Sequence, residues 1–149
     1  MLRALTLIQP WAYAVCHLGK TIENRTWPPP SGIVGQHLAI HAGKKFDEDD
    51  ADAIRNEFGL GVPDVVPVGA IVAVVRVAGA ERVRDELAEN LGLPAQYATR
   101  WSSGPWCWLL ADLVVLPHPV ECRGKQGLWP VEGCTLDMVR EEWRAGRGR

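Results

Sequence analysis

Residues 20–27 bring two cations, a carboxylate and a large aromatic side chain together within one short stretch. If this stretch is extended, Glu23, Arg25 and Trp27 share one face, because side chains alternate along a strand. A carboxylate, a guanidinium and an indole on one face are typical of the floor or rim of a polar pocket. The same spacing also fits a surface ion pair beside a half-buried tryptophan, and the sequence leaves both interpretations open.

The residues before this stretch predict a short helix that delivers Lys20 to a strand. Pro10 suits the first helical turn, and Gly19 suits the position just past the helix end. Apolar residues recur with helical spacing on one face. They are Trp11, Ala14, Val15 and Leu18.

The composition predicts one folded domain, residues 1–149, and no membrane partner. Hydrophobic residues make up 47% and charged residues 23% of the chain, as in ordinary globular domains. No apolar run is long enough to span a bilayer, and the N-terminal residues alternate like a strand instead of resembling a signal peptide. We therefore expect a cytoplasmic protein.

Charge and cysteine content restrict the possible ligands. The net charge of −2 gives no general attraction to nucleic acid, so nucleic-acid binding requires a local basic patch. Seven tryptophans are many for this length, and each can stack on a base or fill a core. The four cysteines form no C-x-x-C pair, so the sequence predicts reduced thiols, no metal site and no cofactor.

The remaining patterns predict an α+β fold built on a small curved sheet or barrel. We expect strands at 5–8, 36–42, 65–77 and 106–116, and a last short strand after a glycine-flanked loop at 124–127. Residues 43–45 and 117–119 are expected to end strands. Helices are predicted after Asp47, over 81–91 and after Thr135, and residues 144–149 are expected to be a frayed tail.

An acidic cluster at 47–52 could be interpreted as a metal site. It lacks the glycine and glutamate positions of a calcium loop. Acidic residues at a helix start favour the interpretation as helix capping and a solvated face. The cluster consists of Asp47, Glu48, Asp49, Asp50 and Asp52.

Three segments in order resemble the ASCH domain family, a branch of the PUA-like superfamily. They are LTLIQPWA at 5–12, KTIENR at 20–25 as a K-x-x-E-x-R pattern, and LAIHAGK at 38–44. The later GLW at 127–129 fits the C-terminal end of longer members. The resemblance covers most of the chain. It implies a PUA-like small mixed β-barrel of about five or six strands surrounded by helices.

The resemblance also implies a cleft at the K-x-x-E-x-R segment that binds RNA, other single-stranded nucleic acid, or a nucleobase such as that of a modified nucleoside. Carried over by position, the cleft residues are Lys20, Glu23 and Arg25. The residues themselves add four neighbours. These are Trp11, Trp27, His41 and Lys44.

Binding chemistry can be assigned to each of these side chains. Lys20, Arg25 and Lys44 could contact phosphates, whose contacts dominate affinity for nucleic acid. Trp11 or Trp27 could stack on a base, and Glu23 could accept a hydrogen bond from an exocyclic amine. Simpler roles remain open for three of them, namely a core position for Trp11, an exposed charge for Lys44 and a hydrogen-bonded wall for His41.

An enzyme is the alternative class, with Lys20 and Glu23 as the catalytic residues. Some of the ASCH-like proteins that this chain resembles hydrolyse the amide of an N4-acylated cytidine. Their nucleophile is a threonine three residues after the lysine. Glu23 occupies that position here and Thr21 lies beside Lys20, so that mechanism does not carry over intact. A ribonuclease could instead use Lys20 or Glu23 as base and His41 as acid. The pattern favours nucleic-acid binding first, a ribonuclease second and an amidohydrolase third. A protein-interaction module is the least favoured class.

Overall fold

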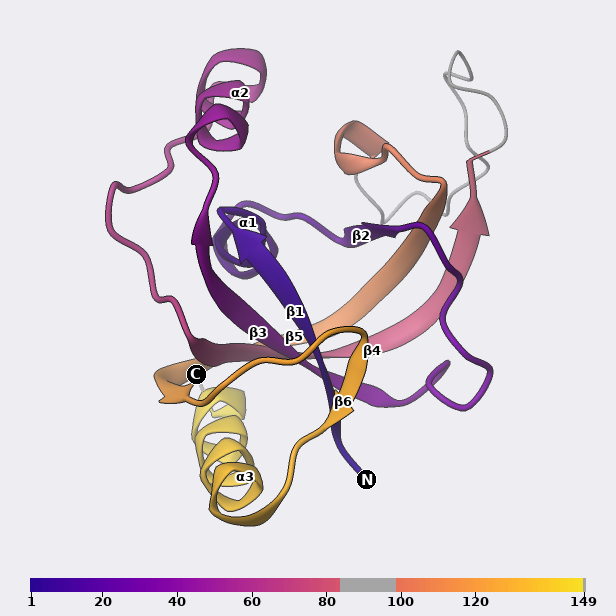
Figure 1. The fold of residues 1–149 in the computed structure, drawn as a ribbon, viewed down its shortest axis with the longest axis vertical. Coiled ribbons are helices and arrows are strands. Elements are labelled where there is room, and N and C mark those ends of the chain that lie inside the picture. Colours follow the sequence, from indigo (N-terminus) through magenta and orange to yellow (C-terminus); the bar gives the residue numbers. More distant parts are fainter. Residues whose placement is uncertain (84–98, 149) are drawn as a thin grey trace.

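One mixed six-stranded sheet with three α-helices makes up residues 1–83 and 99–148, the part of the chain that this computed structural model describes (Figure 1). The strands are β1 (Arg3–Gln9), β2 (Ile22–Arg25), β3 (His37–Phe46), β4 (Ala70–Arg82), β5 (Trp106–Glu121) and β6 (Leu128–Pro130). The helices are α1 (Trp11–His17), α2 (Glu48–Phe58) and α3 (Gly133–Arg147), with a 3-10 turn at Thr99–Trp101. None of these helices is long and apolar enough to cross a membrane.

The strand order is β2-β5-β4-β3-β1-β6, with β1 and β3 parallel and every other neighbouring pair antiparallel. β2 and β6 lie at opposite ends of this order and do not pair, so the ladder does not close into the barrel that we expected. The α+β class is confirmed. The long strands β4 and β5 bend strongly, and three register shifts between them allow that curvature (Figure 1).

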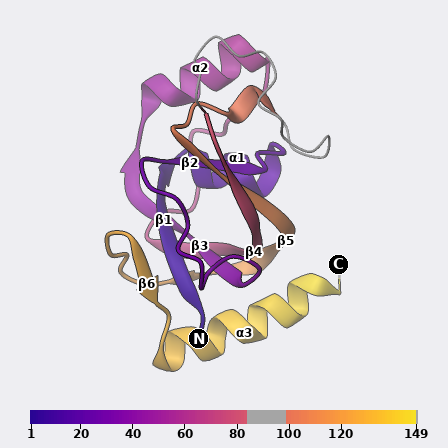
Figure 2. The same cartoon turned by 90° about the vertical axis from the view of Figure 1, so that its right-hand side faces the viewer.

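The central part of the sheet is buried on both faces. The run Ala70–Val75 is buried throughout, as its β-branched composition predicted. In β3, Leu38 and Ile40 pack in the larger core cluster beside α1, whereas Ala39 packs in the cluster that includes Val139 of α3. Figure 2 shows α3 lying across one end of the molecule and α2 at the other end.

The predicted helix boundaries at Gly19 and Asp47 are confirmed. Gly19 follows α1 in a left-handed conformation, with φ of +74°. The Asp47 side chain accepts a hydrogen bond from the Asp50 amide at the start of α2, and Gly59 ends that helix with φ of +65°. The acidic cluster therefore includes a helix cap. Among the described residues no group of three metal-ligating side chains could hold a metal ion.

Two of the predicted strand ends are wrong. β3 continues through residues 43–45 to Phe46, which pairs with Gln9 of β1 after a register shift. β5 continues through Pro117 and Pro119. They lie between the paired positions Val115 and Val120, where the register against β4 shifts, so their missing N–H groups cost no regular ladder bond.

The predictions for 81–91 and for the C-terminal tail also need correction. Glu81 and Arg82 are the last residues of β4 because they pair with β5, and residues 84–91 lie outside the described part. α3 begins at Gly133, two residues before Thr135, and runs through Arg147 instead of fraying. Its last turn packs closely, since a Cβ on Gly146 would lie 2.8 Å from the Val115 carbonyl oxygen.

Candidate nucleic-acid interface

The turn after α1 places the Lys20 side chain next to β2. The amides of Leu18 and Lys20 both donate to the Ala14 carbonyl, and the left-handed Gly19 reverses the chain between them. Lys20 Nζ then lies 3.1 Å from Glu23 Oε1. Both side chains are buried, with 2% of Lys20 and 9% of Glu23 exposed. The core of the K-x-x-E-x-R pattern is therefore a buried ion pair.

The Lys20 ammonium is enclosed on all sides. It donates to the Ile22 carbonyl as well as to Glu23, and it lies 5.7 Å from the centre of the Trp11 ring. Two of its three N–H donors are used by these hydrogen bonds, and the ring lies close to the charge. Lys20 therefore holds Glu23 in place, and its contact with a phosphate stays a prediction.

Arg25 lies next to Glu23, because residues two apart share a face of β2. It contacts the carboxylate oxygen that Lys20 does not. Its Nη2 lies 3.5 Å from Glu23 Oε2 and donates to the Thr6 carbonyl at 2.9 Å. The Nε atom is buried without a hydrogen-bond partner in the described part of the chain, while 24% of the side chain is exposed. Two cations thus flank one carboxylate, and the local charge is +1.

Asn24, on the opposite face of β2, fixes the segment that forms the rim. Its Oδ1 accepts from the amides of Ser103 and Gly104, each at 2.9 Å. Its Nδ2 donates to the Trp101 carbonyl at 2.8 Å. The sequence analysis missed this role because Asn24 contacts residues almost eighty positions later in the chain.

Aromatic side chains from three elements stand beside the ion pair. Trp11 and Trp101 meet edge to face with ring centres 6.4 Å apart, and Phe58 packs edge to face on Trp101 at 4.9 Å. Trp11 is further fixed by its Nε1, which donates to Asp50 at 2.9 Å. The Arg100 guanidinium lies 6.0 Å from the Phe58 ring centre. Trp101 is buried, whereas Trp11 and Phe58 are half-buried.

Together these residues line a cleft of about 530 Å³, which we call the β2 cleft. It contains Trp11, Lys20, Glu23 and Arg25 from the predicted set. Phe58 and Arg100 were not predicted as site residues. The spacing of Phe58 is that of an apolar helix face, and Arg100 has the features of any surface cation. The lining consists of Thr6, Leu7, Ile8, Trp11, Lys20, Glu23, Asn24, Arg25, Phe58, Arg100, Trp101, Ser102 and Ser103.

The other three predicted site residues lie outside the β2 cleft. Trp27 packs edge to face on Trp108 at 4.9 Å, and its carbonyl accepts from Trp108 Nε1. His41 and Lys44 line a separate hollow formed by β3, the end of β5 and the segment that leads to β6. The seven predicted site residues therefore lie in three places. Four line the β2 cleft, His41 and Lys44 line the separate hollow, and Trp27 packs on Trp108.

His41 is a fixed part of the fold. Its Nε2 lies 2.8 Å from the Cys122 carbonyl and its Nδ1 lies 3.1 Å from Thr6 Oγ1. Because a carbonyl only accepts, Nε2 carries a proton and Nδ1 can accept from the Thr6 hydroxyl. Burial lowers the pKa of His41, so the neutral ring is favoured.

This arrangement does not assemble the hydrolytic groups that the sequence suggested. Each oxygen of Glu23 faces a cationic side chain, Lys20 or Arg25, and His41 is in the other hollow. Thr21 lines a different surface, beside Val15 and His17. The β2 cleft can therefore present a charged acceptor and aromatic faces to a ligand, without the predicted acid or the threonine nearby.

Solved structures of other proteins resemble this chain in fold. No protein-family model and no curated protein matches the sequence. ASCH from Zymomonas mobilis superposes with a TM-score of 0.56 over 94% of both chains, at 14% sequence identity. Two variants of ASCH from the same organism superpose with TM-scores of 0.54 at 16% identity, over 94% of this chain and 96% and 94% of theirs. The chain therefore has an ASCH-like fold.

Proposed function

We propose that this protein binds single-stranded RNA by holding one unpaired base in the β2 cleft. The observation that carries the proposal is the Glu23 carboxylate, which two cations hold at the floor of a cleft with aromatic walls. The ASCH-like fold and the K-x-x-E-x-R resemblance, which implies nucleic-acid binding, support the same assignment.

Glu23 keeps one oxygen available for a ligand. Its Oε1 accepts from Lys20 Nζ and from the Asn24 amide, both at 3.1 Å. Its Oε2 has a single long contact of 3.5 Å to Arg25. A base with an exocyclic amino group can donate to this oxygen, and Arg25 can donate to a neighbouring ring acceptor. Cytosine and adenine offer that combination, whereas uracil has no amino group.

The walls of the cleft suit a flat ring. Trp11 and Phe58 are half-buried, Trp11 is held by its bond to Asp50, and Phe58 is held by its contact with Trp101. Stacking a base on such a ring contributes about 1–3 kcal/mol. The volume of about 530 Å³ falls within the range of roughly 300–1,000 Å³ that is typical of small-ligand sites. Arg100, exposed at the rim, can contact the phosphate next to the bound base.

Binding without turnover is the expected behaviour. A general base must reach the proton that it abstracts, and Glu23 is already neutralised by cations on both sides. The threonine of the amidohydrolase-like pattern is absent from the cleft, and so is His41. We therefore expect RNA to be retained and recovered intact.

Fluorescence anisotropy with labelled oligomers of about 12 nucleotides tests this proposal at low salt. We expect oligo(C) to bind more tightly than oligo(U), and Glu23→Gln to remove that preference. Glu141→Gln is the matched control, because Glu141 is exposed on α3 and its substitution changes the net charge by the same amount. Circular dichroism verifies that each variant is folded.

Two results would overturn the proposal. One is a folded Glu23→Gln variant that binds both oligomers as the wild type does. The other is catalytic cleavage of RNA, or of an N4-acylated cytidine, by the metal-free wild type. Gel analysis of the RNA and mass spectrometry of the nucleoside detect these products in the same samples.

A further inference from the structure

A second concave surface lies beside the β2 cleft and is larger, with a volume of about 1090 Å³. We call it the loop hollow, after the segment 122–127 that links β5 to β6 and forms one of its sides. The residues that line it are Thr6, His41, Gly43, Lys44, Val68, Gly69, Glu121, Cys122, Arg123, Gly124, Lys125 and Gln126.

The loop hollow is locally basic, although the net charge of the whole chain is negative. Lys44, Arg123 and Lys125 are exposed in it, and Glu121 is its one acidic side chain. Three positive charges and one negative charge give a local charge of +2, against −2 for the whole chain. None of the three cations has an ion-pair partner within residues 1–83 and 99–148. They are available to an anionic ligand.

A hydrogen bond from His41 and close packing hold the loop that carries two of these cations. The carbonyl of Cys122 contacts His41 Nε2 at 2.8 Å, and the carbonyl of Lys125 lies 3.4 Å from Thr6 Oγ1. Between them Gly124 rests directly on the same pair of side chains. A Cβ at this position would lie 2.6 Å from His41 Cε1 and 2.7 Å from Thr6 Oγ1. The anchored loop keeps Arg123 and Lys125 on the hollow before a ligand arrives.

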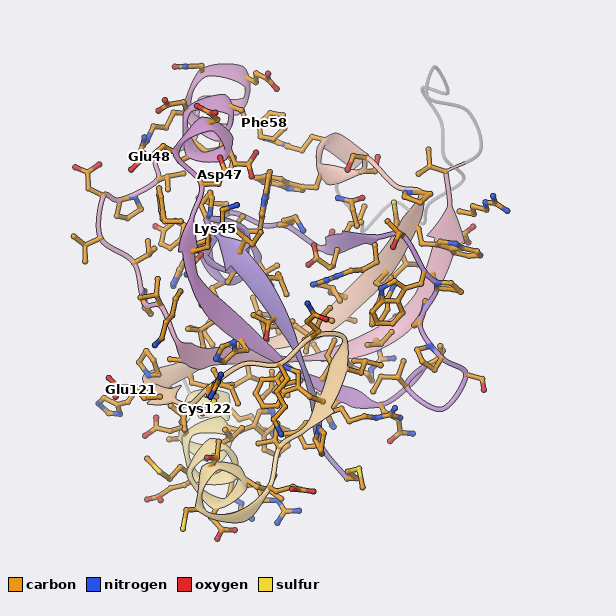
Figure 3. The ribbon with its side chains drawn as sticks, viewed as in Figure 1. Lys45, Asp47, Glu48, Phe58, Glu121 and Cys122 are labelled. Atoms are coloured by element: carbon orange, nitrogen blue, oxygen red, sulfur yellow. The ribbon has the colours of Figure 1, made fainter. Side chains whose placement is uncertain are left out.

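Thr6 connects the loop hollow to the β2 cleft, since it lines both. Its carbonyl accepts from Arg25 in the cleft, and its hydroxyl contacts His41 beneath the loop hollow. In Figure 3, Phe58 of the cleft lies toward one end of the long axis and Cys122 of the hollow toward the other. A strand that crosses Thr6 would therefore run from the Phe58 side of the molecule toward the Cys122 side.

We infer that the loop hollow binds the phosphates of the same nucleic-acid strand whose base occupies the β2 cleft. The ligand is then a polynucleotide, and a free nucleoside would use only half of the surface. This inference rests on the proposed function. It adds a site that contacts the sugar–phosphate backbone, where Lys44, Arg123 and Lys125 neutralise successive phosphates without reading sequence.

A triple variant tests the inference. Lys44→Ala, Arg123→Ala and Lys125→Ala are combined, and the control combines Lys45→Ala, Arg140→Ala and Arg144→Ala, which are exposed cations outside both surfaces with the same total charge. Each phosphate contact on a single strand contributes about −0.7 to the slope of log affinity against log salt. We expect the triple variant to flatten that slope by about 2 and the control to leave it unchanged.

An abasic strand separates the two surfaces. An abasic oligomer of about 12 units offers phosphates but no base, so its binding should depend on the loop hollow alone. We expect the triple variant to lose abasic binding while Glu23→Gln retains it. Equal affinities of the triple variant and its control for the abasic strand would overturn this inference. The proposed function would still stand if oligo(C) binding remained sensitive to Glu23→Gln.

Discussion

Arg25 Nη2 donates to the backbone carbonyl of Thr6 at 2.9 Å, and this bond joins β2 to β1, two strands that share no ladder. β2 is at one end of the strand order, and β1 is next to the other end. A side chain thus bridges the curved sheet where strand pairing would close a barrel. The β2 cleft lies at this gap, so the guanidinium that bridges the fold also lines the cleft in which we propose that a base binds.

Replacing Arg25 by methionine should lower the free energy of unfolding by about 1.5–3 kcal/mol, the usual contribution of hydrogen bonds to a charged group. The Thr6 carbonyl and Glu23 Oε2 both lose their donor. Urea denaturation measures the change. Arg140→Met, on the exposed side of α3, should cost almost nothing, and equal losses in the two variants would contradict this prediction.

Lys20→Met should be more costly, at about 3–5 kcal/mol, because it leaves a buried carboxylate with only part of its partners. Glu23→Gln should also destabilise the protein, since it leaves the enclosed ammonium without a counter-charge. The double variant removes both charges, so its loss should be clearly smaller than the sum of the two single losses. Additive losses in a double-mutant cycle would show that the two groups do not interact.

Phe58→Ala should weaken RNA binding by roughly 5- to 150-fold if the ring stacks on a base. Leu60→Ala is the matched control, because Leu60 packs against the same core cluster as Phe58 but does not line the β2 cleft. Both variants should lose stability, which thermal unfolding reports. Only the first should lose affinity in anisotropy titrations, and a parallel loss in both would assign Phe58 a purely structural role.

The buried His41 should make stability depend on pH. Burial lowers its pKa below the usual 6.5, while the hydrogen bond with the Cys122 carbonyl opposes that shift. Below about pH 6.5 the unfolded chain therefore binds a proton that the folded chain resists, and stability falls until the folded-state pKa is passed. His41→Gln should remove this part of the slope in denaturation from about pH 7.5 to about pH 5. A variant at the exposed His37 should retain it.

Gly124→Ala should destabilise the protein by about 1–3 kcal/mol and displace the loop, because the added methyl group would overlap His41 and Thr6. The salt slope of RNA binding should flatten as Arg123 and Lys125 move away from the strand. Gly61→Ala, where a Cβ has open space and φ is not positive, is the control. An unchanged salt slope in a destabilised Gly124→Ala variant would show that the loop position does not matter for binding.

The parts of the fold that were predictable depend on local patterns. The β-branched run of β4, the alternation in β3, the Asp47 cap and the Gly59 stop all express preferences that neighbouring residues set. The course of β5 through Pro117 and Pro119 depends instead on where its register against β4 shifts. That shift is a property of two strands together, so the sequence of one strand does not show it.

The candidate site likewise has parts that local patterns predicted and parts that depend on contacts between distant segments. Spacing and resemblance predicted that Lys20, Glu23 and Arg25 would lie together, and the structure places them in one cleft. Burial of Lys20 depends on the Trp11 ring, and the cleft wall depends on Phe58, which a distant helix supplies. Lys44 lies between the paired positions Ala42 and Phe46, where β3 carries extra residues relative to β1, so alternation could not predict its direction.

The unclosed sheet leaves two edges, and an exposed edge normally offers its free amide and carbonyl groups to another chain. Both edges here are short, with four residues in β2 and three in β6. Pro130 removes one of the donors of β6, and the side chain of Arg25 crosses from β2 to Thr6. In the described part of the chain, the open gap is therefore not accompanied by a long strand edge, and we expect little strand addition or aggregation at β2 and β6.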